Sequence, residues 1–179
     1  VQKYLAAKGR KIIGWDELLE CNVDQSATIM SWRGAEPGAQ AAALGHDVIM
    51  TPNSHAYFDY YQTANNHNEP LLIGGDLPIE KTYSFEPIPE GTPAEAGKHI
   101  LGVQANLWSE YIVSESLAEY QVLPRMGALS EVQWMDPAQK DFKDFVKRVE
   151  CLRAIYELKG YTYAKHLWPE EHLKGSREL

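Results

Sequence analysis

Carboxylates that follow aromatic rings at a spacing of two are the residues of this chain best suited to chemistry. Asp59 follows Tyr57 in this way, and Glu110 follows Trp108. In an extended segment, residues two apart lie on the same face, so each carboxylate would stand beside a ring. A sugar suits such a pair, because its C–H groups pack on an aromatic face while a carboxylate accepts from its hydroxyls. The five Trp and ten Tyr of the chain fit this interpretation, although an aromatic core would also explain them.

Structural interpretations compete with the functional one for some of these residues. The stretch 100–110 is equally compatible with a loop that carries a core tryptophan and a solvated glutamate. The adjacent Asp16 and Glu17 offer a further pair of carboxylates, but neighbours on a strand face opposite ways. One of these two is therefore expected to be a structural anchor or the start of a helix.

Other classes of site are not indicated. The sequence His67-Asn68-Glu69 lacks the second histidine that a zinc helix needs, and the six histidines are scattered. Gly74-Gly75 lacks the preceding strand and following helix of a dinucleotide loop, so it predicts a turn. We expect neither a metal nor another cofactor.

Composition limits the partners. At 179 residues with 44% hydrophobic content, the chain can form one domain with a sizeable core. A net charge of -8 without clustered Lys and Arg argues against nucleic acid, and no apolar run is long enough to span a bilayer. Cys21 and Cys151 are free thiols or a disulfide, and the sequence does not decide between them.

Four short strands are expected to position the polar and aromatic groups. They fall at residues 10–13, 27–31, 47–51 and 100–103, and polar and aromatic residues follow each one. Strands that alternate with helices predict an α/β fold with a parallel sheet and a ligand site at its carboxyl edge. The long connection 62–99 is expected to be a structured excursion rather than a plain linker.

The second half of the chain predicts helices. Ser116 and Glu119 have the spacing of a capping box, Pro124 should bend the helix or begin a new one, and Asp136-Pro137 should open the last long helix. That helix carries an apolar stripe expected to pack on the sheet. The stripe consists of Phe142, Phe145, Val146, Val149, Leu152, Ile155 and Tyr156.

Five motifs resemble, in order, those of glycoside hydrolase family 20, the β-N-acetylhexosaminidases. They are residues 14–19 (GWDELL), 31–34 (SWRG), 57–62 (YFDYYQ), 83–89 (YSFEPIP) and 102–110 (GVQANLWSE). Residues 124–131 also resemble the helix that follows the last barrel strand of that family. The resemblance covers most of the chain to about Tyr156.

The resemblance implies a (β/α)8 TIM barrel, of which residues 1–160 would be the C-terminal half with about strands five to eight. Residues 161–179 would be a tail. Two open sheet edges would then invite pairing, so the chain is expected to form a homodimer or to need the missing N-terminal half of the barrel. Export to the periplasm or outside the cell is the usual habit of the family.

The implied chemistry is hydrolysis of terminal, non-reducing β-linked N-acetylglucosamine or N-acetylgalactosamine with retention. The acetamido oxygen of this amino-sugar glycoside substrate attacks its own anomeric carbon. By resemblance, Tyr57 is the catalytic residue that donates its hydroxyl to that oxygen. The implied substrate-binding residues are Trp15, Trp32 and Trp108 around the acetamido group and ring, with Asp59 and Glu110 accepting from distant hydroxyls.

The chain departs from the family in one respect. The catalytic Asp-Glu pair of the family lies before Val1, as does the arginine that grips the sugar. Loss of a general acid typically costs about 10²–10⁴ in rate, so the fragment alone is expected to be inactive. The alternative is a non-catalytic carbohydrate-binding barrel fragment that kept the pocket.

Overall fold

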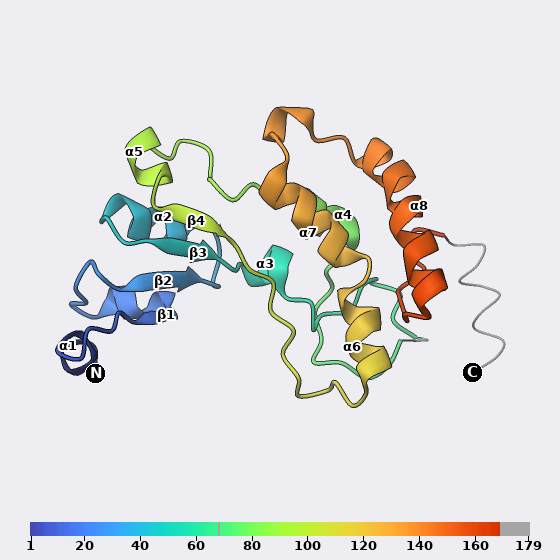
Figure 1. Cartoon of the computed structure of the whole chain (residues 1–179), viewed down its shortest axis with the longest axis horizontal. Coiled ribbons are helices and arrows are strands. Elements are labelled where there is room, and N and C mark those ends of the chain that lie inside the picture. Colours follow the sequence, from blue (N-terminus) through green and yellow to red (C-terminus); the bar gives the residue numbers. More distant parts are fainter. Residues whose placement is uncertain (68, 169–179) are drawn as a thin grey trace. The chain divides into compact units, whose positions relative to one another are not determined.

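The computed structural model describes residues 1–67 and 69–168, and the chain divides into two compact units. Unit 1 comprises Val1–Ala56 and Glu86–Gln104, and unit 2 comprises Tyr57–Phe85 and Ala105–Leu179 (Figure 1). Each unit is described on its own. Of the tail expected at 161–179, residues 169–179 lie outside the described part.

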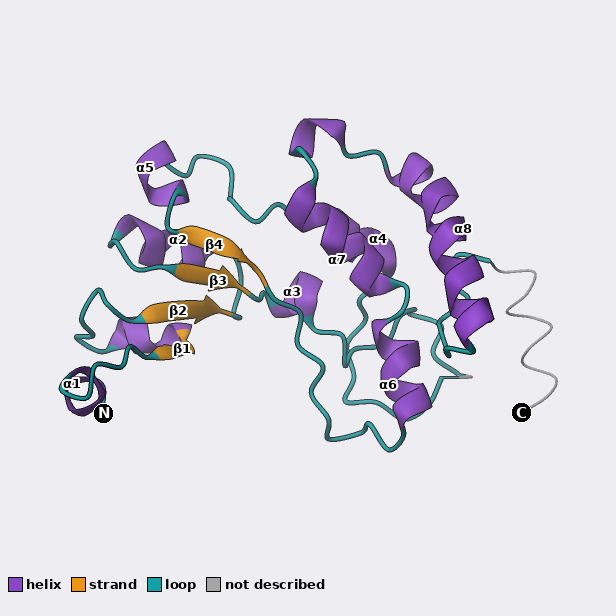
Figure 2. Ribbon diagram, in the orientation of Figure 1, coloured by secondary structure: helices purple, strands orange, loops and turns teal. Residues whose placement is uncertain are grey.

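The described residues of unit 1 form a four-stranded parallel sheet in the order β1-β2-β3-β4, drawn in orange in Figure 2. The strands are β1 (Ile13–Trp15), β2 (Thr28–Ser31), β3 (Val48–Met50) and β4 (Ile100–Val103). The predicted α/β class and parallel sheet are confirmed. The first strand, however, lies at Ile13–Trp15 rather than at 10–13.

The core of unit 1 lies between this sheet and helix α2 (Glu36–Ala43), which packs on β2 and β3. The side chains of Ile29, Val48 and Met50 are fully buried. Gly38 allows the close approach of helix and sheet, because a Cβ there would lie 2.5 Å from the Met50 sulfur. The other elements of this unit are α1 (Gln2–Ala6), the 3₁₀ helix η1 (Asp16–Glu20), α3 (Asn53–Ala56) and α5 (Ala94–Gly97).

Helices and loops make up the described part of unit 2. The helices are α4 (Ile79–Tyr83), α6 (Glu115–Val122), α7 (Arg125–Trp134), the 3₁₀ helix η2 (Pro137–Gln139) and α8 (Phe142–Lys159). The excursion expected at 62–99 is structured in part, since it contains α4 and α5. The break expected at Pro124 is confirmed, because α6 ends before it and α7 begins after it.

Helix α8 buries its apolar stripe among helices. Phe145 and Val149 form one core cluster with Ile79 and Tyr83 of α4 and Ala128 of α7. The rings of Tyr83 and Phe145 are stacked with centroids 4.8 Å apart. The expectation that this stripe packs on the sheet was therefore wrong for Phe145 and Val149, because α4 and α7 supply their apolar partners. The third buried member, Tyr156, packs with Leu123 and Tyr163.

The capping box expected at Ser116 and Glu119 is also wrong. The hydroxyl of Ser114 caps α6 by accepting from the backbone N–H of Leu117 at 3.2 Å. Glu119 instead accepts from the backbone N–H of Thr162 at 2.7 Å. A long-range bond from the C-terminal segment thus takes the carboxylate that a local box would have used.

The start of α8 differs in the same way. Asp136 accepts from the backbone N–H of Ala138 and caps only the short turn η2, whereas Asp141 caps α8. Gly160 ends α8 in the left-handed conformation, as expected for a C-cap.

Both cysteines, Cys21 and Cys151, are free and exposed, so the structure favours the thiol alternative. Within residues 1–67 and 69–168, no helix has the length and apolar character needed to cross a membrane.

Candidate functional site

Asp16 anchors the carboxyl edge of the sheet in unit 1. Its side chain is fully buried at the start of η1. Its Oδ2 accepts from the backbone N–H of Trp32 at 2.9 Å and of Arg33 at 3.1 Å, and its Oδ1 accepts from Arg33 Nε at 2.5 Å. Of the adjacent carboxylates, Asp16 is therefore the structural anchor that the sequence led us to expect.

Glu17 holds the ring of Trp32. Both carboxylate oxygens lie 3.1 Å from Trp32 Nε1, the donor of the indole. A backbone hydrogen bond, the Trp32 bond and the nearby Arg33 charge lower the pKa of Glu17. Glu17 therefore stays ionised, in the form that accepts best, and the nitrogen edge of Trp32 has a fixed partner.

Trp15 is the last residue of β1 and directly precedes the Asp16 anchor. It pairs in register with Met30, two positions before Trp32. Because β1 and β2 are parallel neighbours, both tryptophans belong to the same carboxyl edge of the sheet, where ligand sites of such folds form. The structure therefore places two of the predicted binding residues at one edge of unit 1.

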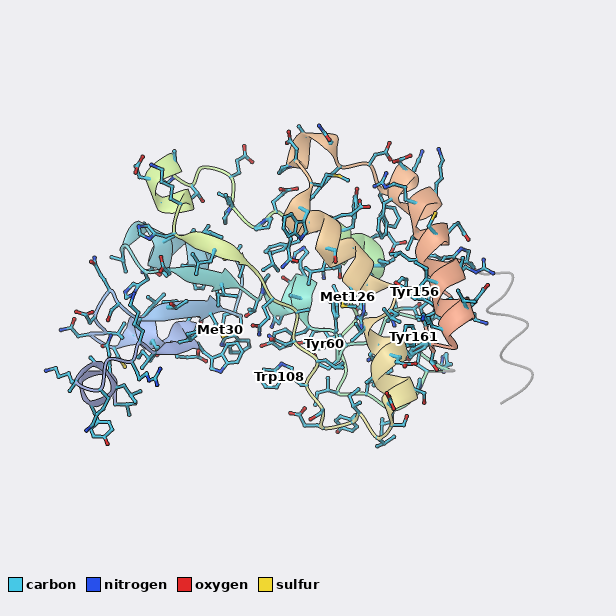
Figure 3. All side chains as sticks on the ribbon, viewed as in Figure 1. Met30, Tyr60, Trp108, Met126, Tyr156 and Tyr161 are labelled. Carbon is cyan, nitrogen blue, oxygen red and sulfur yellow. The ribbon has the colours of Figure 1, made fainter. Side chains whose placement is uncertain are left out.

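Tyr57 and Trp108 come together in unit 2. Tyr57 forms an isolated parallel bridge with Asn106, and the backbone N–H of Phe58 donates to the Asn106 carbonyl at 2.7 Å. The rings of Tyr57 and Trp108 meet edge to face with centroids 6.1 Å apart, and Tyr60 meets Tyr57 at 5.7 Å. Figure 3 labels Tyr60 and Trp108 at this cluster.

Asp59 is a buried carboxylate in the same cluster. Asp59 is only 6% exposed, and its Oδ1 has no hydrogen-bond partner among the residues that the structure describes. Burial raises the pKa of Asp59 to about 6; the Glu110 charge adds to this, whereas a hydrogen bond to its own backbone and the Arg125 charge oppose it. An unpaired buried acceptor is costly, so its retention fits a site that awaits a donor.

Glu110 does not continue a strand. Strand β4 ends at Val103, and both Trp108 and Glu110 lie beyond it at exposed positions. The condition for placing the two side chains on one face, a continuing strand, is therefore not met. The charge of Glu110 nevertheless acts on Asp59, so the two predicted carboxylates of unit 2 belong to one electrostatic environment.

Asn106, Gln121 and Arg125 contribute to this cluster although the sequence analysis assigned them no role. A hydrogen bond from Asn106 tends to lower the pKa of Tyr57, whereas burial, the larger effect, raises it. Gln121 and Arg125 are fully buried. Arg125 had one sequence signal, a Pro-Arg step within a family-like helix, which says nothing about what its side chain contacts, and Gln121 lies outside every motif.

A further cavity of unit 2 lies away from these residues. It is a groove of about 800 Å³ with apolar walls, bounded by α6, α7 and α8. Figure 3 labels Met126, Tyr156 and Tyr161, which line it. None of the predicted sugar-binding residues lines this groove.

Comparisons with known proteins agree on one family. Residues 1–137 match the model of the catalytic domain of glycosyl hydrolase family 20. A beta-hexosaminidase of Porphyromonas gingivalis is 43% identical over 179 residues, which are 99% of this chain and 23% of that protein. A beta-N-acetylhexosaminidase of Cellulomonas fimi is 30% identical over 93% of this chain and 34% of its own length.

Solved structures agree as well. The exo-β-N-acetylglucosaminidase of Vibrio harveyi in complex with N-acetylglucosamine superposes with a TM-score of 0.82 at 31% identity, over 93% of this chain and 26% of that one. The hexosaminidase of Streptomyces coelicolor, at 23% identity and a TM-score of 0.81, shares the fold. The chain thus spans between about a quarter and a third of the length of these relatives.

Proposed function

Because the chain belongs to glycosyl hydrolase family 20, we propose that it is the C-terminal half of a β-N-acetylhexosaminidase barrel. The four parallel strands would be about strands five to eight of that barrel. The complete enzyme would remove terminal, non-reducing β-linked N-acetylglucosamine or N-acetylgalactosamine with retention of configuration.

The cluster around Asp59 is the observation that carries the proposal. A carboxylate with an unpaired buried oxygen lies in the same segment as Tyr57, whose ring meets that of Trp108. Sugar hydroxyls are the donors that such an oxygen lacks, and an indole face suits the apolar side of a pyranose ring.

Tyr57 has the catalytic role in the proposed reaction. Tyr57 donates its hydroxyl to the acetamido oxygen and holds this internal nucleophile against the anomeric carbon. Burial raises the pKa of Tyr57, so its proton is retained at neutral pH. Orientation of an internal nucleophile of this kind is worth roughly 7–11 kcal/mol in favourable cases.

The remaining residues bind the sugar. Asp59 and Glu110 accept from hydroxyls far from the reacting carbon, and Trp108 packs on the ring. Trp15 and Trp32 supply aromatic faces for the acetamido group. Glu17 supports this role, because it holds the indole nitrogen of Trp32.

The proposal leaves the proton donor outside this chain. An Asp-Glu pair upstream of Val1 would protonate the leaving oxygen and steady the acetamido nitrogen. The chain alone would then bind a hexosamine, but its hydrolysis would be slower by at least about 10²–10⁴ because the general acid is missing.

A chimera tests the proposed function. Residues 1–179 replace the matching segment of the Porphyromonas gingivalis beta-hexosaminidase, which then supplies everything upstream. We expect the chimera to hydrolyse an aryl β-N-acetylglucosaminide and the isolated chain not to. Tyr57→Phe in the chimera should lower kcat by about 10²–10³, because one preorganised donor is lost. A folded chimera without activity would reject the proposal.

We also propose that the parent protein is exported. A separate proposal is that the sheet of unit 1 pairs through its two edge strands. β1 and β4 are the outer strands, and Ile13 and Leu101 on them are each 62% exposed. Edges of this kind need a partner, which would be the missing half of the barrel or a second copy of the chain. Gel filtration of the isolated chain and of the chimera distinguishes the two.

A further inference from the structure

Arg125 is a fully buried cation whose hydrogen bonds all go to backbone carbonyls. Nε donates to the Gln121 carbonyl at 3.0 Å, and Nη2 donates to the carbonyls of Gln121 at 2.6 Å and Phe58 at 2.5 Å. Nη1 donates to the carbonyls of Tyr60 at 3.2 Å and Leu77 at 3.1 Å. A buried charge is normally retained only with such full satisfaction of its donors.

The segment held in this way is 57–61, which contains Tyr57 and Asp59, two of the residues predicted to contact the sugar. Arg125 bonds the carbonyl of Phe58, and Gln121 Nε2 donates to the carbonyls of Asp59 and Tyr60 at 3.3 Å each. Three successive carbonyls thus accept from the pair Gln121 and Arg125. In a regular strand, successive carbonyls point in alternating directions. The backbone at 58–60 is not such a strand, so its carbonyls need donors from outside the segment.

The same guanidinium also fixes the chain that runs beside this segment. Leu77 N–H donates to the Tyr61 carbonyl at 2.7 Å, and Tyr61 N–H donates to the Gly75 carbonyl at 3.2 Å. Arg125 bonds the Leu77 carbonyl and therefore ties both lines of this short ladder together. The Gly74-Gly75 turn, expected from the sequence, is part of the same support.

We propose that Arg125 and Gln121 together are positioning residues for the segment 57–61, and that by holding the carbonyls of Phe58, Asp59 and Tyr60 they direct Tyr57 and Asp59 toward a sugar. The identity of the sugar rests on the proposed function. The positioning itself is measurable without any ligand.

The charge of Arg125 acts in the same direction as its hydrogen bonds. It opposes the rise in the pKa of Asp59 that burial and the Glu110 charge produce. An ionised carboxylate accepts more strongly from a hydroxyl than a neutral one does. Arg125 therefore acts on Asp59 in two ways, through the backbone on both sides of it and, to a smaller extent, through its charge.

Two substitutions separate position from charge. Arg125→Lys keeps the charge but replaces five donors in a rigid fork with three donors at one point. Arg125→Gln removes the charge as well. Arg148→Lys is the matched control, because Arg148 lies at the surface of the same unit and pairs with Glu131.

Three readouts are taken on the 179-residue chain. The carboxyl carbon resonance of Asp59 is followed with pH, the ring resonances of Tyr57 report its surroundings, and calorimetry gives the affinity for a thiazoline mimic of the N-acetylglucosamine oxazolinium ion. Cooperative urea unfolding establishes that each variant is folded.

We expect Arg125→Lys to shift the Tyr57 resonances and to weaken thiazoline binding by about 10- to 100-fold, with the pKa of Asp59 near its wild-type value. Arg125→Gln should weaken binding similarly and raise the pKa of Asp59 above its wild-type value. Arg148→Lys should change none of these quantities.

A folded Arg125→Lys or Arg125→Gln with wild-type Tyr57 and Asp59 resonances would overturn the proposal. If neither variant folds, Gln121→Met decides, because it removes only the two bonds to the Asp59 and Tyr60 carbonyls and leaves every charge in place. Unchanged resonances there would also overturn it. Failure of the wild-type chain to bind thiazoline would count against the proposed function, while the resonances would still test the positioning.

Discussion

Glu17 accepts a hydrogen bond from the indole nitrogen of Trp32, the only polar atom of the Trp32 side chain. Both carboxylate oxygens of Glu17 lie 3.1 Å from this nitrogen. The neighbouring Asp16 holds the backbone N–H of the same tryptophan. Two adjacent carboxylates on η1 thus fix Trp32 at its backbone and at its ring. The sequence predicted a structural role for one of the two carboxylates, whereas in the structure both Asp16 and Glu17 hold Trp32.

The first prediction concerns that ring. Glu17→Gln should move the indole N–H resonance of Trp32 upfield, because a charged acceptor is replaced by a neutral one. In the wild type this resonance should move as the pH falls through the lowered pKa of Glu17, since protonation weakens the acceptor. Heteronuclear NMR from pH 7 to pH 3 measures both effects.

Glu36→Gln is the control, since Glu36 is an exposed carboxylate of the same unit in the first turn of α2. In Glu36→Gln, the indole N–H resonance of Trp32 should change with pH as it does in the wild type. An unchanged Trp32 resonance in Glu17→Gln would show that the bond is not formed in solution.

The second prediction concerns the cost of the buried Asp59. Its pKa is raised from 3.8 to about 6, so between these values the folded state binds more protons than the unfolded state. The contribution of Asp59 to the free energy of unfolding is therefore fully present below about pH 4 and is lost as the pH rises through about 6. Asp59→Asn should raise the free energy of unfolding at pH 7.5 by up to about 3 kcal/mol, with a much smaller gain near pH 4.

Urea denaturation at pH 4 and pH 7.5 measures this difference. Asp76→Asn serves as control, because Asp76 is exposed in the same unit. A gain in stability that does not depend on pH would contradict the prediction. A stabilised variant that no longer binds the sugar would show that Asp59 is kept for its ligand at the expense of stability.

The third prediction concerns a partly buried cluster of Glu69, Tyr120 and His166. The Tyr120 hydroxyl lies 2.8 Å and 2.6 Å from the two Glu69 oxygens, and His166 Nε2 lies 3.0 Å from Glu69. Tyr120→Phe removes the hydroxyl bonds from a carboxylate whose side chain is 3% exposed. The variant should lose about 1–3 kcal/mol of unfolding free energy.

Urea denaturation at pH 7 measures that loss, and Tyr111→Phe provides the comparison at a hydroxyl on an exposed residue of the same unit. Equal stabilities of the two variants would mean that the cluster contributes nothing. A loss confined to Tyr120→Phe would mean that it ties the loop at Glu69 to α6 and to the C-terminal segment.

Much of the fold could be predicted from local pattern. The four parallel strands and the helix break at Pro124 follow from short apolar runs and from a residue that cannot continue a helix. The caps of α6 and α8 could not, because Ser114 and Asp141 compete with neighbours of the same chemistry. Which of two candidates caps a helix depends on where a distant residue, such as Thr162, needs an acceptor.

The candidate site was predictable in its aromatic and acidic members only. Tyr57 and Asp59 carry a spacing and a family motif, whereas Arg125 and Gln121 carry neither a charge partner nor a periodicity that points to their carbonyl acceptors. Such contacts join residues more than sixty positions apart, and only the folded backbone brings them together. The role of Arg125 therefore emerged from the structure.

Calorimetric titration of the chimera with the thiazoline mimic shows directly whether this chain carries hexosamine-binding residues. Trp108→Ala and Asp59→Asn should each weaken binding by about 10- to 100-fold, as expected for loss of an aromatic wall or a charged acceptor. Trp134→Ala, at a tryptophan that is 90% exposed, should leave the affinity unchanged. Wild-type affinity in both Trp108→Ala and Asp59→Asn would contradict the account.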